Sequence, residues 1–325
     1  MKRFLLIFLL FLNSIPIFCT DQLDLILSEE IKHLEDRGGK PLVVSLTGFY
    51  FEDKQLGSSF SRYLEEKLSK TLANSAEFEL FAKEKLEEIL ATIEISLTDL
   101  FESETAVRVG HLKGIQALIG GRYFDEGDRI RIFLDLINLE TGTVTRKREF
   151  IIQKRFVPPT ISLLPDNYTN ALYVLNQLTD VVSAEKGELY VKVWITRGNG
   201  STFRAGEELL INFFSTRDCY IKVYHVDVHK QIQLIFPNQY YPNNFIKKEK
   251  IYKIPDSRYP FKFVLGPPFG TEFIKVVAST LQFRDIEESF SDLGEASRDF
   301  ISRGMTVQQR KEQVTESLLN YTIIE

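Results

Sequence analysis

Two of the four histidines lie in one short stretch with an aspartate between them. His225, Asp227 and His229 alternate along a segment with the pattern of a β-strand. Because residues two apart in a strand share a face, these side chains are candidate ligands for a divalent metal such as zinc, and a metal-dependent hydrolase is the enzymatic alternative. We favour a simpler interpretation, in which the strand is exposed or a turn near 228–230 separates the side chains. We therefore predict no metal and no other cofactor.

Nucleophilic catalysis needs a base in contact with the nucleophile. Cys219 and His225 lie in the same apolar run, but an extended strand between them holds the two side chains apart. No Gly-x-Ser-x-Gly elbow, Walker loop or dinucleotide-binding glycine motif is present in the sequence. The sequence therefore predicts no catalytic residues and no enzymatic activity.

Aromatic residues in two turn-rich loops are the best candidates for a binding surface. Tyr240 and Tyr241 precede the sequence Pro-Asn-Asn, and Phe269 lies in the loop Gly-Pro-Pro-Phe-Gly. Exposed tyrosines suit recognition because they combine apolar area with a hydroxyl group. The proline-rich loop can instead close a corner of a β-sandwich, and a glycan or peptidoglycan is the alternative ligand for the aromatic side chains.

The first 19 residues have the composition of a secretory signal peptide. Lys2 and Arg3 precede an apolar run at 4–12, and Pro16 then breaks the helical pattern. The run is shorter than the roughly 20 apolar residues that a membrane-spanning helix needs. We therefore expect the mature protein to be exported to the periplasm or outer membrane of a bacterium.

Cys19 distinguishes two forms of the exported protein. Cleavage after Cys19 gives a soluble product, whereas a lipid on Cys19 tethers the chain to a membrane. A bacterial lipobox has a small residue just before the cysteine and usually leucine three positions before it, and these positions hold Phe18 and Pro16. We therefore disfavour the lipid anchor.

The charge of the chain argues against one class of partner. Without residues 1–19, the chain has 38 basic and 45 acidic residues, a formal charge of −7. Nucleic-acid backbones need concentrated basic surface, so we expect no nucleic-acid partner. The predicted partners are other envelope proteins. Membrane association and the oligomeric state are left open.

The elements that must position these residues indicate an α+β protein with two domains. We expect a helix within 20–40, followed by alternating helical and strand patterns over 41–155, beginning with a strand at Leu42–Phe51 and including a third helix from Ser103. One predicted helix face has apolar residues at every fourth position, namely Phe60, Leu64, Leu68 and Leu72. Helices between strands, followed by a hairpin, predict an α/β domain with a mixed sheet.

The rest of the chain changes character twice. Residues 156–187 begin with three prolines and continue with a helical pattern, which predicts a linker and a connecting helix. From 188 to 285 the apolar period is two and turns separate the runs, which predicts a β-sandwich. The tail at 286–325 is mostly helical in character, with a predicted helix at Gln308–Leu319 and an edge strand at Tyr321–Ile324.

Four segments of the first domain carry a family resemblance over residues 41–153. They are GSSFSRYLEEKLSKTL, FELFAKEKLEEIL, GHLKGIQALIGGRYF and IRIFLDLINLETGTV. The pattern resembles the envelope proteins typified by the flagellar FlgO lipoprotein and, more distantly, the curli secretion lipoprotein family. Lys83 stands where that family usually has arginine. The resemblance implies a place in outer-membrane, flagellar or secretion assemblies and no enzyme residues.

The second domain carries a sharper resemblance over residues 203–280. The segments FRAGEELLINFFSTRDCYIKVYHVD, QLIFPN and GPPFGTEFIKVVAS occur in the order seen in the domain of unknown function 4384 family, which they resemble. Cys219 replaces a glycine of that family, and His229 and Lys230 replace a turn of the Asp-Gly type. The resemblance implies a β-sandwich accessory domain for binding or targeting. We therefore predict an exported, non-enzymatic envelope protein that binds or helps to assemble other proteins.

Overall fold

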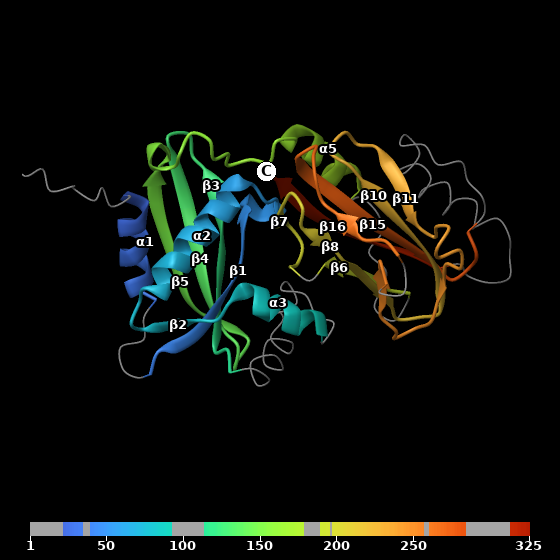
Figure 1. The fold of residues 1–325 in the computed structure, drawn as a ribbon, viewed down its shortest axis with the longest axis horizontal. Coiled ribbons are helices and arrows are strands. Elements are labelled where there is room, and N and C mark those ends of the chain that lie inside the picture. Colours follow the sequence, from blue (N-terminus) through green and yellow to red (C-terminus); the bar gives the residue numbers. More distant parts are fainter. Residues whose placement is uncertain are drawn as a thin grey trace, which may run out of the picture.

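The computed structural model describes residues 22–34, 40–92, 114–178, 189–195, 197–256, 260–283 and 313–325. These residues form two domains that lie side by side along the longest axis of the molecule (Figure 1). Helices occur together with mixed and antiparallel sheets, so the predicted α+β fold is confirmed. The predicted signal peptide and the predicted third helix lie outside the described residues.

The N-terminal domain is built on one five-stranded sheet. Its strands are β1 (Leu42–Phe51), β2 (Phe78–Leu80), β3 (Ala117–Asp125), β4 (Arg129–Asn138) and β5 (Thr143–Gln153). They lie in the order β2-β1-β3-β4-β5, with β1 parallel to both of its neighbours and the other pairs antiparallel. The mixed direction of this sheet is the one that the sequence predicts.

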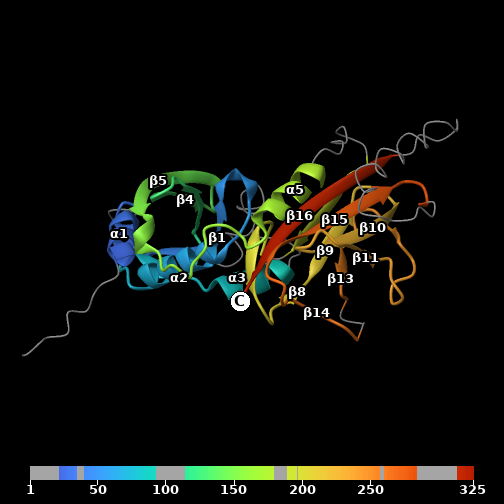
Figure 2. The same ribbon diagram turned by 90° about the horizontal axis from the view of Figure 1, so that it is seen from above.

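Two helices, α1 (Gln22–Lys32) and α2 (Ser59–Ala73), cover the same face of this sheet (Figure 2). The hydroxyl of Ser58 accepts hydrogen bonds from the backbone N–H groups of Phe60 and Ser61, so Ser58 caps the start of α2. The predicted apolar face of α2 is buried in the core of the domain. A further helix, α3 (Lys83–Thr92), buries Leu86 and Leu90 in a separate apolar cluster.

A linker runs from the end of β5 to the second domain. It begins with a single 3-10 turn, η3 (Lys154–Phe156), passes through three prolines and ends at α5 (Tyr168–Leu178). Asn167, just before α5, binds both backbone groups of Thr271: its Nδ2 donates to the carbonyl oxygen at 2.8 Å and its Oδ1 accepts from the N–H at 2.7 Å. The C-terminal end of the linker is therefore fixed to the second domain.

The C-terminal domain contains two main sheets around one apolar core. The larger sheet consists of β7 (Ser201–Arg204), β10 (Cys219–Val226), β11 (Ile232–Phe236), β12 (Phe245–Ile246), β15 (Gly270–Ser279) and β16 (Val314–Ile324). The smaller sheet consists of β6 (Val191–Ile195), β9 (Ile211–Ser215) and β13 (Tyr252–Ile254). A short separate pair is formed by β8 (Glu208–Leu209) and β14 (Phe263–Val264). This sandwich-like arrangement is the one that the sequence predicts.

The last strand differs from the predicted helical tail. Val314–Leu319, within the predicted helix at Gln308–Leu319, belong to β16, which pairs with β15 along most of its length. Its last residues, Tyr321–Ile324, also pair with β7, so they are not at the edge of the sheet as predicted. Polar residues in this stretch resemble a helix pattern, but the continuous pairing of Val314–Ile323 with β15 and the burial of Leu319, Tyr321 and Ile323 favour the strand. Residues 284–312 lie outside the described part of the chain.

The two domains are in direct contact beside the start of α2. The hydroxyl of Thr322 in β16 donates a hydrogen bond to the carbonyl oxygen of Gly57 at 3.1 Å. Asn199 Nδ2 donates to Gln55 Oε1 at 2.6 Å, close to the same point. Within the described residues, no helix is both long and apolar enough to cross a membrane.

Candidate functional site

The structure does not bring the three candidate metal ligands, His225, Asp227 and His229, together. The ring Nε2 of His225 lies 2.8 Å from Glu272 Oε2, and the hydroxyl of Tyr321 donates to the same oxygen at 2.8 Å. Asp227 instead closes a turn, where its Oδ1 accepts from the N–H groups of His229 at 2.9 Å and Gln231 at 2.7 Å. Among the residues that the structure describes, no group of three His, Cys, Asp or Glu side chains could hold a metal ion.

Cys219 is a buried residue of the sandwich core. Its side chain is completely inaccessible to solvent, and burial raises the pKa of its thiol. Cys219 and His225 stand six positions apart on the same strand, β10, so the strand separates their side chains. The two residues therefore do not form a nucleophile and base pair.

The three predicted binding aromatics have different environments. Tyr240 is 42% exposed. The hydroxyl of Tyr241 accepts a hydrogen bond from the N–H of Asp256 at 3.0 Å, and Phe269 packs against the sandwich core. Of the three, Tyr240 therefore offers the most solvent-exposed surface.

Sequence reasoning missed two aromatic residues, Phe261 and Phe263, that extend the surface around Tyr240. The ring centroid of Phe261 lies 4.9 Å from that of Tyr240 and 5.7 Å from that of Phe263. Val264, next in the chain, is 61% exposed. The alternation of Phe261 and Phe263 along one short run is the only signal in the sequence, and the contact of Phe261 with Tyr240 depends on how the two loops fold.

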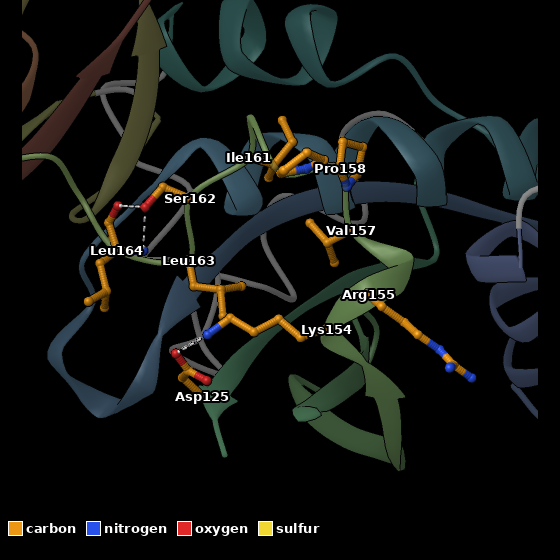
Figure 3. Close-up of a pocket in the computed structure, with 10 residues that line it drawn as sticks. Asp125, Lys154, Arg155, Val157, Pro158, Ile161, Ser162, Leu163 and Leu164 are labelled. Carbon is orange, nitrogen blue, oxygen red and sulfur yellow. Dashed lines mark hydrogen bonds and ion pairs between the residues drawn. The ribbon is translucent and has the colours of Figure 1, made fainter. Parts of the chain in front are cut away.

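A pocket on the linker was not predicted. It has a volume of about 550 Å³ and is lined by Asp125, Lys154, Arg155, Val157, Pro158, Pro159, Ile161, Ser162, Leu163 and Leu164 (Figure 3). Apart from Asp125, which ends β3, these residues belong to the linker. The sequence identifies this stretch as a linker from its prolines, but it gives no signal that the chain curls around a hollow.

The linker pocket has a fixed shape. The carbonyl oxygen of Ser162 accepts a hydrogen bond from Phe60 N–H at 3.0 Å, and its N–H donates to Ser59 Oγ at 2.8 Å. The hydroxyl of Tyr123 donates to the carbonyl oxygen of Leu163 at 3.0 Å. These bonds tie the linker to the first turn of α2 and to β3, and the prolines restrict its backbone further.

Two cations stand at the rim of the linker pocket. Lys154 Nζ forms an ion pair with Asp125 Oδ2 at 2.7 Å. The guanidinium of Arg155 lies over the ring of Phe156, 5.4 Å from its centroid, and no ion pair to Arg155 is found within the described part of the chain. Figure 3 shows its side chain extending away from the Lys154–Asp125 pair. Arg155 is therefore available to an acidic ligand.

The lining residues of the linker pocket are suited to binding. The hydroxyl of Ser162 donates to the carbonyl oxygen of Leu164 at 2.7 Å, and the residues that line the pocket include no histidine to act as its base. A nucleophile needs such a base within hydrogen-bond reach. The pocket therefore offers apolar contact and charge, without a nucleophile and base pair.

A second hollow lies between α2 and the start of α3, with a volume of about 450 Å³. Its central charges bind each other: Lys83 Nζ lies 2.7 Å from Glu65 Oε1, and both side chains are largely buried. Lys83 therefore has a structural role here. We regard the linker pocket as the better candidate site.

Comparison with known proteins identifies part of the second domain. Residues 202–282 match the model of a family described as a domain of unknown function (DUF4384). This match confirms the resemblance predicted for the C-terminal half of the chain. No curated protein sequence matches this chain.

Solved structures of bacterial lipoproteins are similar to parts of the chain. The LpoB C-terminal domains from Salmonella enterica and Escherichia coli both have a TM-score of 0.33, with 17% and 15% sequence identity, and each match covers 40% of this chain and 95% of the other. The lipoprotein GNA1162 from Neisseria meningitidis has a TM-score of 0.29 and 10% identity, covering 44% of this chain and 100% of that one. The FlgO-type resemblance of the first domain stays a prediction.

Proposed function

We propose that this protein is an exported, non-enzymatic component of a bacterial cell envelope that binds other proteins and supports their assembly. The observation that carries the proposal is the linker pocket, where a fixed apolar wall adjoins the accessible cation Arg155. A site of this kind holds a segment of a partner through apolar contact and charge. The signal-peptide pattern of residues 1–19 supports the envelope location.

The fixed shape of the linker pocket favours binding. Ordering a flexible loop on association costs free energy, and a loop that is already held in place avoids most of this cost. Residues 158–163 are held at Ser162 by α2 and at Leu163 by Tyr123. The pocket therefore resembles a preformed anchor site more than a mobile loop.

The position of the linker pocket also suits an assembly role. The same linker that forms the pocket ends at Asn167, which is bound to Thr271 of the second domain. A partner seated on the linker therefore lies close to the junction of the two domains, where it can contact both.

Cross-linking in cells tests this function. Tagged protein is cross-linked in the cells that produce it and is then purified at physiological salt. We expect defined envelope partners with the wild type and their loss with Pro159→Asp, which places a charge on an exposed wall of the pocket. Pro41→Asp, at the exposed residue just before β1, serves as the matched control and should retain the partners. Recovery of no partner with the wild type would contradict the proposal.

The cluster of Tyr240, Phe261 and Phe263 favours a second candidate, a surface for glycans or peptidoglycan. The ring of Phe261 contacts the rings of both Tyr240 and Phe263, and together with the exposed Val264 they form an apolar patch on the second domain. Such patches mark binding surfaces. Sedimentation with purified peptidoglycan tests it. Binding that is lost in a Tyr240→Ala, Phe261→Ala double variant, while Pro159→Asp still binds, would support this candidate over the linker pocket.

A further inference from the structure

The linker pocket also indicates the chemistry of the segment that it binds. We infer that it takes an acidic segment of a partner protein, with one apolar side chain in the pocket and a neighbouring Asp or Glu carboxylate on Arg155. This inference rests on the proposed function, because it names the partner's chemistry at the same site. It is carried by the apolar wall, by the balance of charge at the rim and by the use of the backbone groups.

The wall of the pocket matches an apolar side chain. Val157, Ile161, Leu163 and Leu164 line it together with two prolines. Val157 and Leu163 also belong to the core of the N-terminal domain, and Ile161 and Leu164 pack against that core, so the wall is supported from behind. The volume of about 550 Å³ lies within the range of roughly 300–1,000 Å³ that is usual for ligand pockets.

The balance of charge at the rim selects an acidic partner. The carboxylate of Asp125 is engaged by Lys154 at 2.7 Å, so these two charges offset each other. Arg155 then leaves the rim with one positive charge, in a chain whose overall formal charge is −5. A guanidinium binds a carboxylate through two parallel hydrogen bonds, and contact with the ring of Phe156 orients the Arg155 side chain.

Backbone groups of the linker are already used, which argues against binding by strand addition. The carbonyl oxygens of Lys154 and Pro158 accept from the N–H groups of Val157 at 3.0 Å and Ile161 at 2.9 Å. The carbonyl oxygen of Leu163 accepts from Tyr123. Strand addition depends on free main-chain groups, so recognition at this pocket depends on side chains instead.

A peptide selection tests the inference and does not require the partner to be identified first. A phage-displayed library of random 12-residue peptides is selected on the full chain, and the enriched peptides are synthesised with a fluorescent label. We expect enrichment of sequences in which Asp or Glu stands within two positions of Leu, Ile, Phe or Met. Fluorescence anisotropy should show affinities that weaken as salt is raised, because the ion pair at the rim is exposed.

Variants of Arg155 identify the charged contact. Arg155→Glu should weaken binding roughly 10- to 100-fold, as expected for loss of a charge-assisted hydrogen bond. Arg155→Lys keeps the charge but loses the paired hydrogen bonds, so it should fall between Arg155→Glu and the wild type. Lys248→Glu, at an exposed lysine in the other domain, is the control and should bind like the wild type.

The outcomes separate this inference from the proposed function. Enriched peptides that lose binding with Pro159→Asp, but are not acidic and ignore Arg155→Glu, would overturn the inference and leave a protein-binding pocket. Peptides whose binding is unchanged by both Pro159→Asp and Arg155→Glu would show that they bind outside the pocket, which would contradict the proposed function. Binding of anionic lipid vesicles that depends on Arg155, in the absence of any enriched peptide, would overturn the choice of a protein partner.

Discussion

Arg197 in the second domain lies against Glu87 on α3 of the first, with Nε 3.1 Å from Glu87 Oε2. The same guanidinium donates to both carboxylate oxygens of Glu207, at 2.8 and 2.9 Å, and lies over the ring of Phe203 at 4.5 Å. The side chains of Arg197 and Glu87 are 19% and 13% exposed. One largely buried arginine therefore links the two domains.

Loss of this arginine should destabilise the protein. Arg197→Ala leaves the carboxylate of Glu87 buried without its partner, and removal of one member of a buried pair costs about 3–5 kcal/mol. We expect a loss of about 3 kcal/mol in the free energy of unfolding, measured by urea denaturation, because Arg197 is partly exposed. Arg129→Ala is the control, since that side chain is 60% exposed, and it should change stability by less than about 0.5 kcal/mol. Equal stability of the two variants would contradict this role for Arg197.

The two carboxylates on Arg197 should respond to pH in opposite directions. Burial raises the pKa of Glu87 above its ordinary value of 4.5, although the charge of Arg197 opposes the shift. For Glu207 burial also acts to raise the pKa, but hydrogen bonds from Arg197 and from the N–H of Arg204 outweigh it, and the pKa lies below 4.5.

The sign of each effect follows from proton binding. Folded Glu87 binds a proton more tightly than the unfolded chain does, so its contribution to stability decreases as pH rises above 4.5. Folded Glu207 binds a proton less tightly, so its contribution is lost as pH falls below 4.5. We expect the difference in unfolding free energy between the wild type and Glu87→Gln to decrease as pH rises. The difference between the wild type and Glu207→Gln should instead decrease as pH falls. Urea denaturation between about pH 3 and pH 7 measures both, and trends of the same sign would contradict the assignment.

Close contact between the domains depends on a glycine. Gly200 has φ +76°, and an added Cβ there would meet the carbonyl group of Gln55. Gly206 has φ +90°, but its added Cβ would meet nothing within 4 Å. Both alanine variants suffer backbone strain of about 1–2 kcal/mol, so Gly206→Ala is the matched control. We expect Gly200→Ala to unfold with a free energy lower by about a further 1–3 kcal/mol, and equal losses in thermal denaturation would show that the contact is not tight.

Much of the fold follows from the pattern of apolar residues. The four-residue spacing from Phe60 to Leu72 predicts a helix face that is indeed buried, and the alternation in β4 predicts a sheet with one buried face. The strand at Val314–Ile324 differs from the helical pattern because its two neighbours in the sheet come from distant parts of the chain. The pattern of residues next to one another in the chain carries no information about pairing with such distant strands.

The candidate site is much harder to predict than the fold. The linker pocket depends on Ser162 meeting the start of α2 and on Tyr123 reaching Leu163, contacts between residues about 100 and 40 positions apart. The loop composition around Tyr240 indicates a surface residue, but Phe261 reaches it through folding of a separate loop. His225 is a candidate metal ligand from the sequence alone. Its actual partner, Glu272, lies 47 positions away, so no local pattern reveals that the two side chains meet.

The processed N-terminus tests the export prediction. If cleavage follows Cys19, the intact mass of the mature protein corresponds to a chain that begins at Thr20. Cys19→Ser should then leave both export and the mature mass unchanged, because Cys19 is discarded. A mature protein that retains Cys19 with the added mass of lipid would contradict the prediction and place the chain on a membrane.

Site-specific photo-cross-linking tests the central claim most directly. A photoreactive amino acid replaces Pro159 on the exposed wall of the linker pocket, and a second protein carries it in place of Lys248 as the control. Irradiation of cells that produce each protein should give a discrete adduct with an envelope protein from position 159 and none from position 248. The adduct from position 159 should weaken when Arg155→Glu is added. The absence of any adduct at 159, or equal adducts at both positions, would contradict the claim that this pocket binds a protein partner.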